Sequence, residues 1–285
     1  MKLTLVFNVF NKATTLESVL TSWINRLSFQ RAYEVIVTCD ACVDGTAEVA
    51  RKVLQAYAGV LTGWQVVETP DIYEIAANNL ALRLAAWDSD LILFIQDDNW
   101  MFSSKWDVAL VEAQRLVARP GATALLAGGV FHADGIGYMR VECSGEHKGD
   151  HFDKHRIPKD KYPLAVYGVD FVTRPFAIHT TLLRDLGGLA SPDYERLCFD
   201  DTDLSVKLLR QDYTNLYLPC DVLNTSMGQE TMKEAMRYCF DHNQEVFRRI
   251  HQQWLQWRDG NTFKMVRPLT LNDGRLSFAE PVYDL

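Results

Sequence analysis

Residues 91 to 100 read Leu91-Ile92-Leu93-Phe94-Ile95-Gln96-Asp97-Asp98-Asn99-Trp100. The five apolar residues have the length and composition of a buried strand, and two carboxylates follow soon after it. In open α/β sheets, ligands bind beyond the carboxyl ends of parallel strands. Paired acids at such a position commonly hold a divalent cation that in turn holds phosphates. We therefore predict a buried strand that ends in a cation and phosphate site.

The composition is that of an ordinary soluble globular protein. With 285 residues and 48% hydrophobic content, the chain can bury one large core. Its formal net charge of -8 disfavours a broad nucleic-acid surface, which needs clustered Lys and Arg. An acidic protein that handles phosphates is expected to use a metal ion instead.

The apolar stretches are strand-sized, and none approaches the roughly 20 residues that cross a bilayer. Met1 to Phe7 is followed by Asn8 and lacks a small-residue cleavage site, which predicts a first strand and no signal peptide. We expect a cytoplasmic protein without a transmembrane segment. The six cysteines are dispersed and predicted to be buried free thiols. Cys39 and Cys42 have the spacing of a redox or zinc pair, but no second pair completes four ligands.

Strands and helices are predicted to alternate along the first hundred residues. The hydrophobic pattern predicts strands over 2–9, 33–38, 64–68 and 91–95, and helices over 14–27, 46–57 and 75–87. This order implies a parallel sheet covered by helices on both faces. The predicted fold class is α/β, with a Rossmann-like, mostly parallel sheet.

The second half of the chain is less regular. The pattern predicts helices over 106–117 and 182–186 and strands over 138–143, 169–173 and 176–179. Residues 145–163 are polar and charged, which is typical of a loop or a lid. His147, His151 and His155 recur there every four residues. A solvated loop, a contact with acceptor or diphosphate, and a zinc site are the alternatives for them.

An amphipathic segment runs from Met232 to Trp257, with apolar residues at three- and four-residue steps. Core packing is the default interpretation of such a segment. A homodimer interface and peripheral docking on a membrane surface are the alternatives. The chain has no internal repeat or Pro-rich linker, so we predict one domain with a helical tail.

A second acidic cluster, Phe199-Asp200-Asp201-Thr202-Asp203-Leu204, begins another predicted helix. Three carboxylates within four residues exceed what capping requires, since one cap satisfies the orphan amides. Repulsion and partial burial raise the pKa of such an acid, whereas the helix amino terminus lowers it. A spare acid that titrates near neutrality would suit a general base.

Side chains alternate across a strand, so Gln96 and Asp98 are predicted to face one way and Asp97 the other. The amide of Gln96 can bond ribose hydroxyls but is a weak ligand for a hard cation. Asp98 is therefore the first candidate metal ligand and Asp97 the second. The alternative is that the two acids cap a helix that follows them.

Together with these acids, further blocks in the same order resemble family 2 glycosyltransferases of the GT-A fold. Phe7-Asn8-Val9-Phe10-Asn11 resembles the family's opening strand, which ends in an aromatic residue and Asn beside the nucleobase. Residues 37–46 are similar to its second strand and Asp-rich turn, where an Asp accepts from the uracil imide. Cys39 replaces one acid of that turn. Asn79-Leu80-Ala81 resembles the helix before the metal motif. The resemblance implies nucleotide contacts for Phe10, Asn11, Asp40 and Asn79.

Two later blocks carry the resemblance further. Gln96-Asp97-Asp98 stands where the family has D-x-D, with Gln96 towards ribose and Asp98 towards the metal. Gly187-Gly188 and Asp200 to Leu204 resemble the Gly-Gly and Glu-Asp-x-Asp-Leu blocks, whose second acid is the catalytic base. That position is Asp201, with Asp200 beside it. Some members supply a metal-binding His after the next strand, and Asn224 stands in the corresponding place.

The resemblance covers roughly residues 1–228. It implies a GT-A domain with a nucleotide-binding half over about 1–100 and an acceptor-binding half over about 101–228, and residues 229–285 are predicted to form a helical extension packed on it. The implied activity is inverting transfer of a sugar from a nucleoside diphosphate sugar, with UDP favoured, to a hydroxyl of a glycan, lipid-linked or other acceptor. Mg or Mn would be held by Asp98 and Asn224.

A rival interpretation is a nucleotide-sugar or glycan binding protein that kept the fold and lost catalysis. The replacement of expected ligands by Cys39, Gln96 and Asn224 motivates it. A sugar nucleotidyltransferase would need a Gly-rich phosphate loop after the first strand, and residues 8–12 contain no glycine. Glycosyl transfer therefore remains the primary hypothesis.

Overall fold

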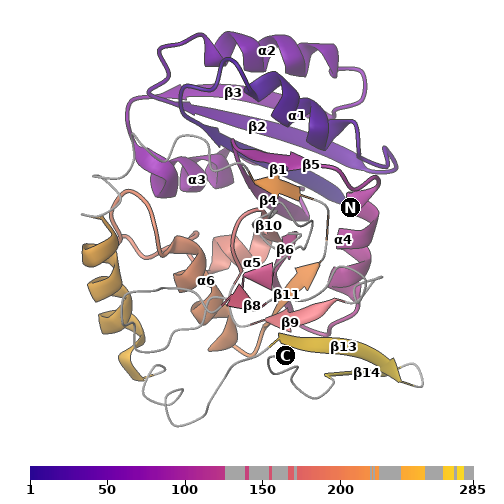
Figure 1. The fold of residues 1–285 in the computed structure, drawn as a ribbon, viewed down its shortest axis with the longest axis vertical. Coiled ribbons are helices and arrows are strands. Elements are labelled where there is room, and N and C mark those ends of the chain that lie inside the picture. Colours follow the sequence, from indigo (N-terminus) through magenta and orange to yellow (C-terminus); the bar gives the residue numbers. More distant parts are fainter. Residues whose placement is uncertain are drawn as a thin grey trace.

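Figure 1 shows the computed structural model of the chain, an α/β protein built around one large sheet. The structure describes residues 1–125, 139–140, 154–155, 166–169, 172–218, 220, 222–224, 239–253, 266–272 and 275–278. Most of the predicted loop over 145–163, with His147 and His151, lies outside these residues. Within it, only the short strand β8 (Lys154–His155) is described, and it pairs with β7 (Met139–Arg140).

The first hundred residues alternate strands and helices as predicted. The elements are β1 (Lys2–Val9), α1 (Leu16–Ile24), β2 (Ala32–Asp40), α2 (Thr46–Ala56), β3 (Gly63–Thr69), α3 (Tyr73–Leu84) and β4 (Leu91–Gln96). Strand β1 lies between β2 and β4 and pairs with both in parallel, and β3 pairs in parallel with β2. Asn8 of β1 therefore lies level with Gln96, so the carboxyl ends of both strands meet at one edge.

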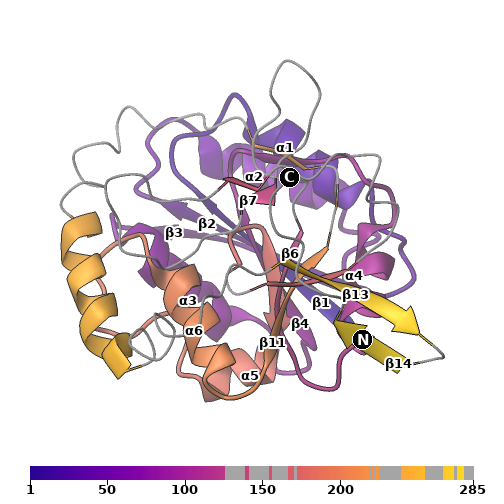
Figure 2. The same cartoon turned by 60° about the horizontal axis from the view of Figure 1, so that its bottom comes forward.

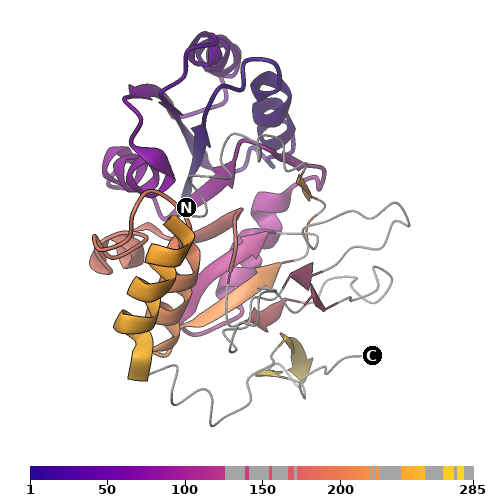
Figure 3. The same cartoon turned by 60° about the vertical axis from the view of Figure 1, so that its left-hand side comes forward.

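The helices cover both faces of this parallel part. The chain steps from β1 to β2 to β3 in one direction, which places α1 and α2 on one face. It then returns from β3 to β4 on the other side of β1, which places α3 on the opposite face (Figures 1 and 3). Strands β1, β2 and β4 are buried almost throughout, because each is covered on both faces.

The second half extends the same sheet with a mixture of directions. Its elements are β5 (Asn99–Met101), α4 (Trp106–Arg115), β6 (Pro120–Leu125), β9 (Tyr167–Val169), β10 (Phe176–His179), α5 (Thr180–Asp185), α6 (Asp200–Leu209), β11 (Thr214–Leu218) and β12 (Val222–Asn224). The order of the ten described strands in the sheet is β14-β13-β9-β11-β6-β10-β4-β1-β2-β3. Following the pairings along it, β9, β10 and β14 run against the other seven, so the predicted mostly parallel sheet is confirmed.

The tail is helical only in part. A helix over 239–253 packs beside α6 (Figures 2 and 3), within the predicted segment 232–257, whose remaining residues lie outside the described part. Beyond it, β13 (Val266–Asn272) and β14 (Arg275–Phe278) form an antiparallel hairpin that adds to the sheet at β9. The prediction of a helical extension over 229–285 is therefore wrong for residues 266–272 and 275–278, which are strands. Within the described residues, no helix is long and apolar enough to span a membrane.

Trp106, which stands a few residues after the metal motif, is a core residue. It is 1% exposed and meets Trp23 edge to face, with the ring centroids 5.3 Å apart. Trp23 Nε1 donates to the carbonyl of Asn99, and Trp106 Nε1 donates to the carbonyl of Trp23. These bonds tie α1 and α4 to β5, the strand that directly follows Asp97 and Asp98.

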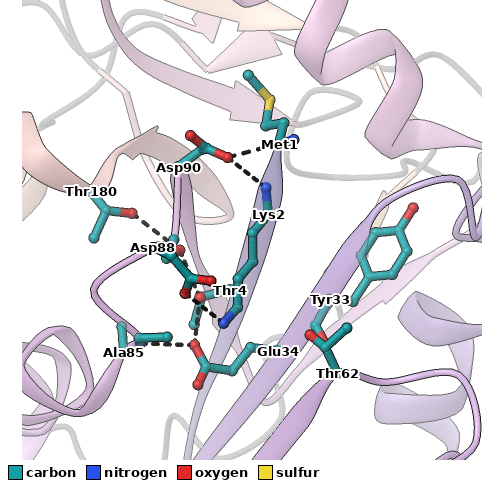
Figure 4. Close-up of polar contacts among 12 residues, drawn as sticks. Met1, Lys2, Thr4, Tyr33, Glu34, Thr62, Ala85, Asp88, Asp90 and Thr180 are labelled. Atoms are coloured by element: carbon teal, nitrogen blue, oxygen red, sulfur yellow. Dashed lines mark hydrogen bonds and ion pairs between the residues drawn. The ribbon is translucent and has the colours of Figure 1, made fainter.

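A buried polar network holds the amino-terminal ends of the strands, at the edge opposite the acids of β4 (Figure 4). Glu34 of β2 is 6% exposed, and its Oε2 accepts from Thr4 Oγ1 at 2.8 Å and from the amide of Ala86 at 3.0 Å. Thr4 Oγ1 also bonds Ser89 Oγ at 2.8 Å. A hollow of about 650 Å³ beside Lys2 opens at this same edge, so it lies away from the acids of β4.

Replacing Thr4 with Val is expected to destabilise the fold, because the buried carboxylate of Glu34 loses a donor while the shape of the side chain is kept. Losing one hydrogen bond to a charged group costs about 1.5 to 3 kcal/mol, although the bond from Ala86 remains. Urea unfolding measures the loss as a lower midpoint at an unchanged slope. Thr14→Val, at an exposed position, is the matched control and should stay within about 0.5 kcal/mol of wild type. Equal midpoints for both variants would contradict the role of the network.

Candidate active site

Carboxylates from two distant parts of the chain converge at the carboxyl edge of the sheet. Asp97 and Asp98 follow β4, and Asp200 and Asp201 begin α6. Between them lies Glu74, in the first turn of α3. The pKa of Glu74 is raised by burial, and the charges of both Asp200 and Asp98 raise it further. One acid from each predicted acidic stretch therefore lies close enough to Glu74 to raise its pKa.

Asp97 lies against the end of β1. Its Oδ2 accepts from the backbone amide of Phe10 at 3.2 Å, and Lys12 Nζ lies 3.5 Å from its Oδ1. Burial raises the pKa of Asp97 to about 7, and the charges of Asp98 and Glu74 add to this although Lys12 opposes it. An excess of negative charge at one place is what a divalent cation would neutralise.

Asp98 accepts from Asn99 Nδ2 at 3.1 Å, and burial raises its pKa while Lys12 lowers it. The next element is β5, and α4 begins only at Trp106. Asp97 and Asp98 therefore do not cap a following helix, and that alternative is wrong. Strand β5 pairs with β12, with Asn224 opposite Asn99, so the backbone of Asn224 comes close to the metal motif as its predicted role requires.

The acids at this edge suit a hard divalent cation. Carboxylate oxygens are the preferred ligands of Mg and Mn, and such ions are commonly held by one or two carboxylates together with substrate phosphates. Among the residues that the structure describes, no cluster of three His, Cys, Asp or Glu side chains could enclose a metal alone. Asp98 and Asp97 fit a cation that a bound diphosphate completes.

Asp201 differs from the acids on either side of it. Its Oδ1 accepts from the amide of Thr202 at 2.8 Å, within the first turn of α6. Burial raises the pKa of Asp201 to about 6, the charges of Asp200 and Glu74 add to this, and Arg174 opposes it. In the described part of the chain no cation pairs directly with Asp201. A carboxylate with this pKa is ionised at pH 7.5 and still basic enough to take a proton.

Asp200 and Asp203 are both occupied by partners. Asp200 is 1% exposed and forms an ion pair with Arg174, whose Nη2 contacts Oδ2 and whose Nη1 lies 3.4 Å from Oδ1. Asp203 is fully buried and accepts from Lys207 at 2.6 Å and from Tyr194 at 3.1 Å, and it pairs with His251 at 2.7 Å. Its pKa is lowered, chiefly by the bond to His251 against the effect of burial. Asp200, predicted as catalytic beside Asp201, is thus engaged by Arg174, and its catalytic role stays a prediction.

Arg174 and Glu74 are functional candidates that the sequence pattern does not reveal. Arg174 Nε lies 3.4 Å from Glu74 Oε1, so one guanidinium meets carboxylates of both α3 and α6. A hydrogen bond from Gln96 also reaches Glu74. A lone Arg before Pro175 and a lone Glu at a helix start read as ordinary surface residues.

The predicted nucleobase residues come together because β1 and β2 are parallel neighbours. Phe10 is 37% exposed at the end of β1, and Asn11 Oδ1 accepts from the amide of Val43 at 2.9 Å. Asp40, at the end of β2, accepts from the amides of Ile72 and Tyr73, each at 2.8 Å. The carboxylate of Asp40 therefore closes the turn that leads into α3, in addition to any contact with a ligand.

Asn79 of α3 has a structural partner. Its Oδ1 accepts from the amide of Leu189 at 3.0 Å, and a Cβ at Gly188 would lie 2.5 Å from that oxygen. Gly188 also has a φ of 109°, which other residues rarely adopt. The Gly-Gly block is thus explained by the close approach of Asn79. The neighbouring Asn78 accepts from Asn8 Nδ2 at 2.5 Å, which ties α3 to β1.

Cys39 and Cys42 behave as protonated thiols. Burial raises the pKa of Cys39 to about 12 and also raises that of Cys42. Cys42 Sγ accepts from the amide of Asn11 at 3.3 Å and donates to the carbonyl of Val9 at 3.4 Å. All described cysteines are free thiols. The pair therefore supports the loop after β1, and its surroundings do not favour thiolate chemistry.

The helix over 239–253 holds the loop that precedes α6. Asn243 is fully buried and donates from Nδ2 to the carbonyls of Glu195 and Leu197 at 2.8 and 2.7 Å, while its Oδ1 accepts from the amide of Glu195 at 2.9 Å. Phe199, the last residue before Asp200, packs on Phe247 with centroids 5.6 Å apart. Core packing, the default interpretation of the amphipathic segment, is thus observed for these side chains.

Only solved structures, among the known proteins compared, are similar to this chain. No protein-family model and no curated protein matches the sequence. Among solved structures, the chain is similar to the mannosyltransferase PcManGT of Pyrobaculum calidifontis in complex with GDP-Man and Mn2+, with 17% identity, a TM-score of 0.54 and coverage of 76% of this chain and 56% of that one. It is also similar to S. aureus TarS 1-349 in complex with UDP, with 16% identity, a TM-score of 0.52 and coverage of 79% and 59%.

The chain has the GT-A fold. GalNAc-T7 with UDP, GalNAc and Mn2+ agrees, with 14% identity, a TM-score of 0.61 and coverage of 78% of this chain and 43% of that one. The chain spans little more than half the length of PcManGT and of TarS 1-349. At this level of identity, the GT-A fold is the shared property. The acids of β4 and α6 lie at the carboxyl edge of its sheet, where α/β folds bind ligands.

Proposed function

We propose that the protein is a glycosyltransferase that moves a sugar from a nucleoside diphosphate sugar to an acceptor hydroxyl, with inversion and with Asp201 as general base. The supporting observation is the convergence of Asp98 and Asp201 from opposite halves of the chain, joined through Glu74, Arg174 and Asp200. Inverting transfer requires the ligand of the metal at the leaving diphosphate and the base at the attacking hydroxyl to lie on opposite sides of the reacting carbon.

On the donor side, Phe10, Asn11 and Asp40 are proposed to contact the nucleobase, with UDP favoured, and Asn79 and Gln96 the rest of the nucleoside. Asp98, with Asp97 and Asn224, would hold Mg or Mn. When bound, such an ion neutralises charge on the leaving diphosphate and contributes several kcal/mol. The similar structures support this choice of ligands, since they are complexes with GDP-Man, UDP, UDP-GlcNAc and Mn2+.

On the acceptor side, Asp201 is proposed to remove the proton of the attacking hydroxyl. A positioned base contributes about 10²- to 10⁴-fold in rate. The amide of Thr202 donates to Oδ1 of Asp201 at the start of α6, and the raised pKa of Asp201 suits this task. The proposed acceptor group is a hydroxyl of a glycan, a lipid-linked sugar or another hydroxyl compound.

The second candidate function is binding of a nucleotide sugar or glycan without catalysis. The neutral residues Cys39, Gln96 and Asn224 at expected ligand positions favour it.

A thermal-shift screen separates these functions. We expect UDP- or GDP-sugars with Mn to raise the melting temperature, with a gain of about 2.7 kcal/mol at a ligand concentration of 100 Kd. ADP-ribose with Mn is the control ligand and should give no shift. Release of nucleoside diphosphate from the stabilising donor supports the transferase, and stabilisation without any release over a panel of acceptors supports the binding protein. A screen without any shift would contradict both.

A further inference from the structure

Arg174 lies between the two halves of the site and pairs with a carboxylate from each. It lies two residues before β10 and is 7% exposed. Its Nη2 and Nη1 face the two oxygens of Asp200 in α6, and its Nε lies 3.4 Å from Glu74 in α3. One side chain from the loop before β10 thus joins the first turns of two helices. Glu74 and Asp200 are 126 positions apart in the sequence.

The charges explain why this residue is an arginine. Two carboxylates close to each other, Glu74 and Asp200, repel unless a cation lies between them. A guanidinium offers a flat fork that can bond one carboxylate with two nitrogens and leaves its Nε for another. The ammonium of a lysine is a point charge and cannot fix the orientation of both carboxylates at once. Burying such a charge is costly unless it is fully paired, so the arrangement fixes the positions of its partners.

Both partners lead to reacting groups of the proposed transferase. On the donor side, Glu74 receives a hydrogen bond from Gln96 and feels the charge of Asp98. On the acceptor side, Asp200 is the immediate neighbour of Asp201 in the same helical turn. We propose that Arg174 is a positioning residue that sets Asp201 relative to the donor side by bridging Glu74 and Asp200. This inference rests on the function proposed above.

The same bridge sets the charge state of the base. The groups that face Asp201 are Asp200 of its own helix, Glu74 of α3, Arg174 beside β10 and the thiol of Cys198 in the preceding loop. Of these, Arg174 is the cation and lowers the pKa of Asp201, whereas the two carboxylates raise it. Removing Arg174 should therefore raise the pKa of Asp201 and leave less of the base ionised at neutral pH.

Two variants test the bridge. Arg174→Lys keeps the charge and loses the fork, and Arg174→Met loses both. We expect both to lower kcat by at least about 10-fold with little change in KM for the donor, because misplacing a reacting group by about 1 Å can cost 10²-fold. Only Arg174→Met should move the acidic limb of the kcat/KM profile to higher pH. Arg83→Met, at an exposed position in the last turn of α3, is the matched control and should behave as wild type.

Two further measurements distinguish a positioning role of Arg174 from a general loss of folding. Guanidinium chloride at millimolar concentration should restore part of the activity of Arg174→Ala, which a misfolded variant would not allow. Titration by carbon NMR of labelled Asp carboxyls reads the pKa of Asp201 without any turnover, and Arg174→Met should raise that pKa.

The results separate this inference from the proposed function. A folded Arg174→Met protein with wild-type kcat, acidic limb and Asp201 titration would overturn the inference and leave glycosyl transfer intact. Conversely, if wild type transfers no sugar while the Asp201 titration still moves in Arg174→Met, the bridge stands and the transferase proposal fails. Loss of folding in all three Arg174 variants, with Arg83→Met normal, would also overturn a positioning role, because Arg174 would then serve the fold alone.

Discussion

Asp201→Asn is expected to lower turnover by about 10²- to 10⁴-fold, the usual contribution of a positioned general base. The amide is isosteric and keeps the oxygen that accepts from Thr202, so donor affinity should stay within about twofold of wild type. The melting temperature should not fall. Burial raises the pKa of Asp201, so its ionised form is less favourable in the folded protein than in the unfolded chain, and a neutral amide removes that penalty.

The control for this variant is Asp212→Asn, the same change at an exposed carboxylate beyond the end of α6. Single-turnover rates with saturating donor and calorimetric donor affinity separate the chemical step from binding. In the wild type, kcat/KM should fall tenfold per pH unit below about pH 6, because protonated Asp201 cannot accept a proton. Near-normal turnover of Asp201→Asn, with the acidic limb unmoved, would show that another group is the base.

The parallel half of the fold follows from local sequence signals. Leu91 to Ile95 has no polar residue that a surface could use, and a strand that is buried on both faces requires such a run. The carboxyl end of that strand then has to coincide with the end of β1, because parallel neighbours share one direction. The location of Asp97 and Asp98 beside Phe10 and Lys12 is therefore predictable from order alone.

The different partners of the three acids of α6 could not be predicted in the same way. Asp200, Asp201 and Asp203 are the same residue type within four positions, and what separates them is partners from elsewhere. Arg174 comes from the loop before β10 and His251 from the tail, and neither spacing nor periodicity joins them to α6. The family resemblance implies Asp201 as the base. Among the described residues, Asp201 differs from Asp200 and Asp203 in having no cation paired directly with it.

The missed hairpin β13–β14 is a different kind of error. Asp273-Gly274 lies between two runs of alternating residues, and Asp-Gly in such a setting is a strong hairpin signal. The predicted helical extension over 229–285 overlooks this signal, because the amphipathic pattern that supports a helix ends at Trp257. By contrast, β5 and β12 are three residues each and stabilise only as a pair, so no local pattern reveals them.

Asp98→Asn is expected to abolish the effect of Mn on donor binding. In wild type, Mn should increase the thermal shift given by a UDP- or GDP-sugar, since carboxylate and diphosphate oxygens complete the coordination of one ion. An amide at position 98 repeats the chemistry of Gln96 and is a poor ligand for a hard cation. Turnover should fall by about 10²- to 10³-fold, which corresponds to losing 3 to 4 kcal/mol of charge stabilisation.

Asp90→Asn is the control for this change, because Asp90 precedes β4 at the opposite edge of the sheet, where it accepts from the amide of Lys2. The fold of Asp98→Asn should persist, since burial raises the pKa of Asp98 and its ionised form is therefore disfavoured in the folded state. Equal Mn-dependent shifts in Asp98→Asn and wild type would remove Asp98 from the metal site. If Asp97→Asn alone lost the Mn effect, the metal ligand would be the carboxylate beside Lys12 and the end of β1.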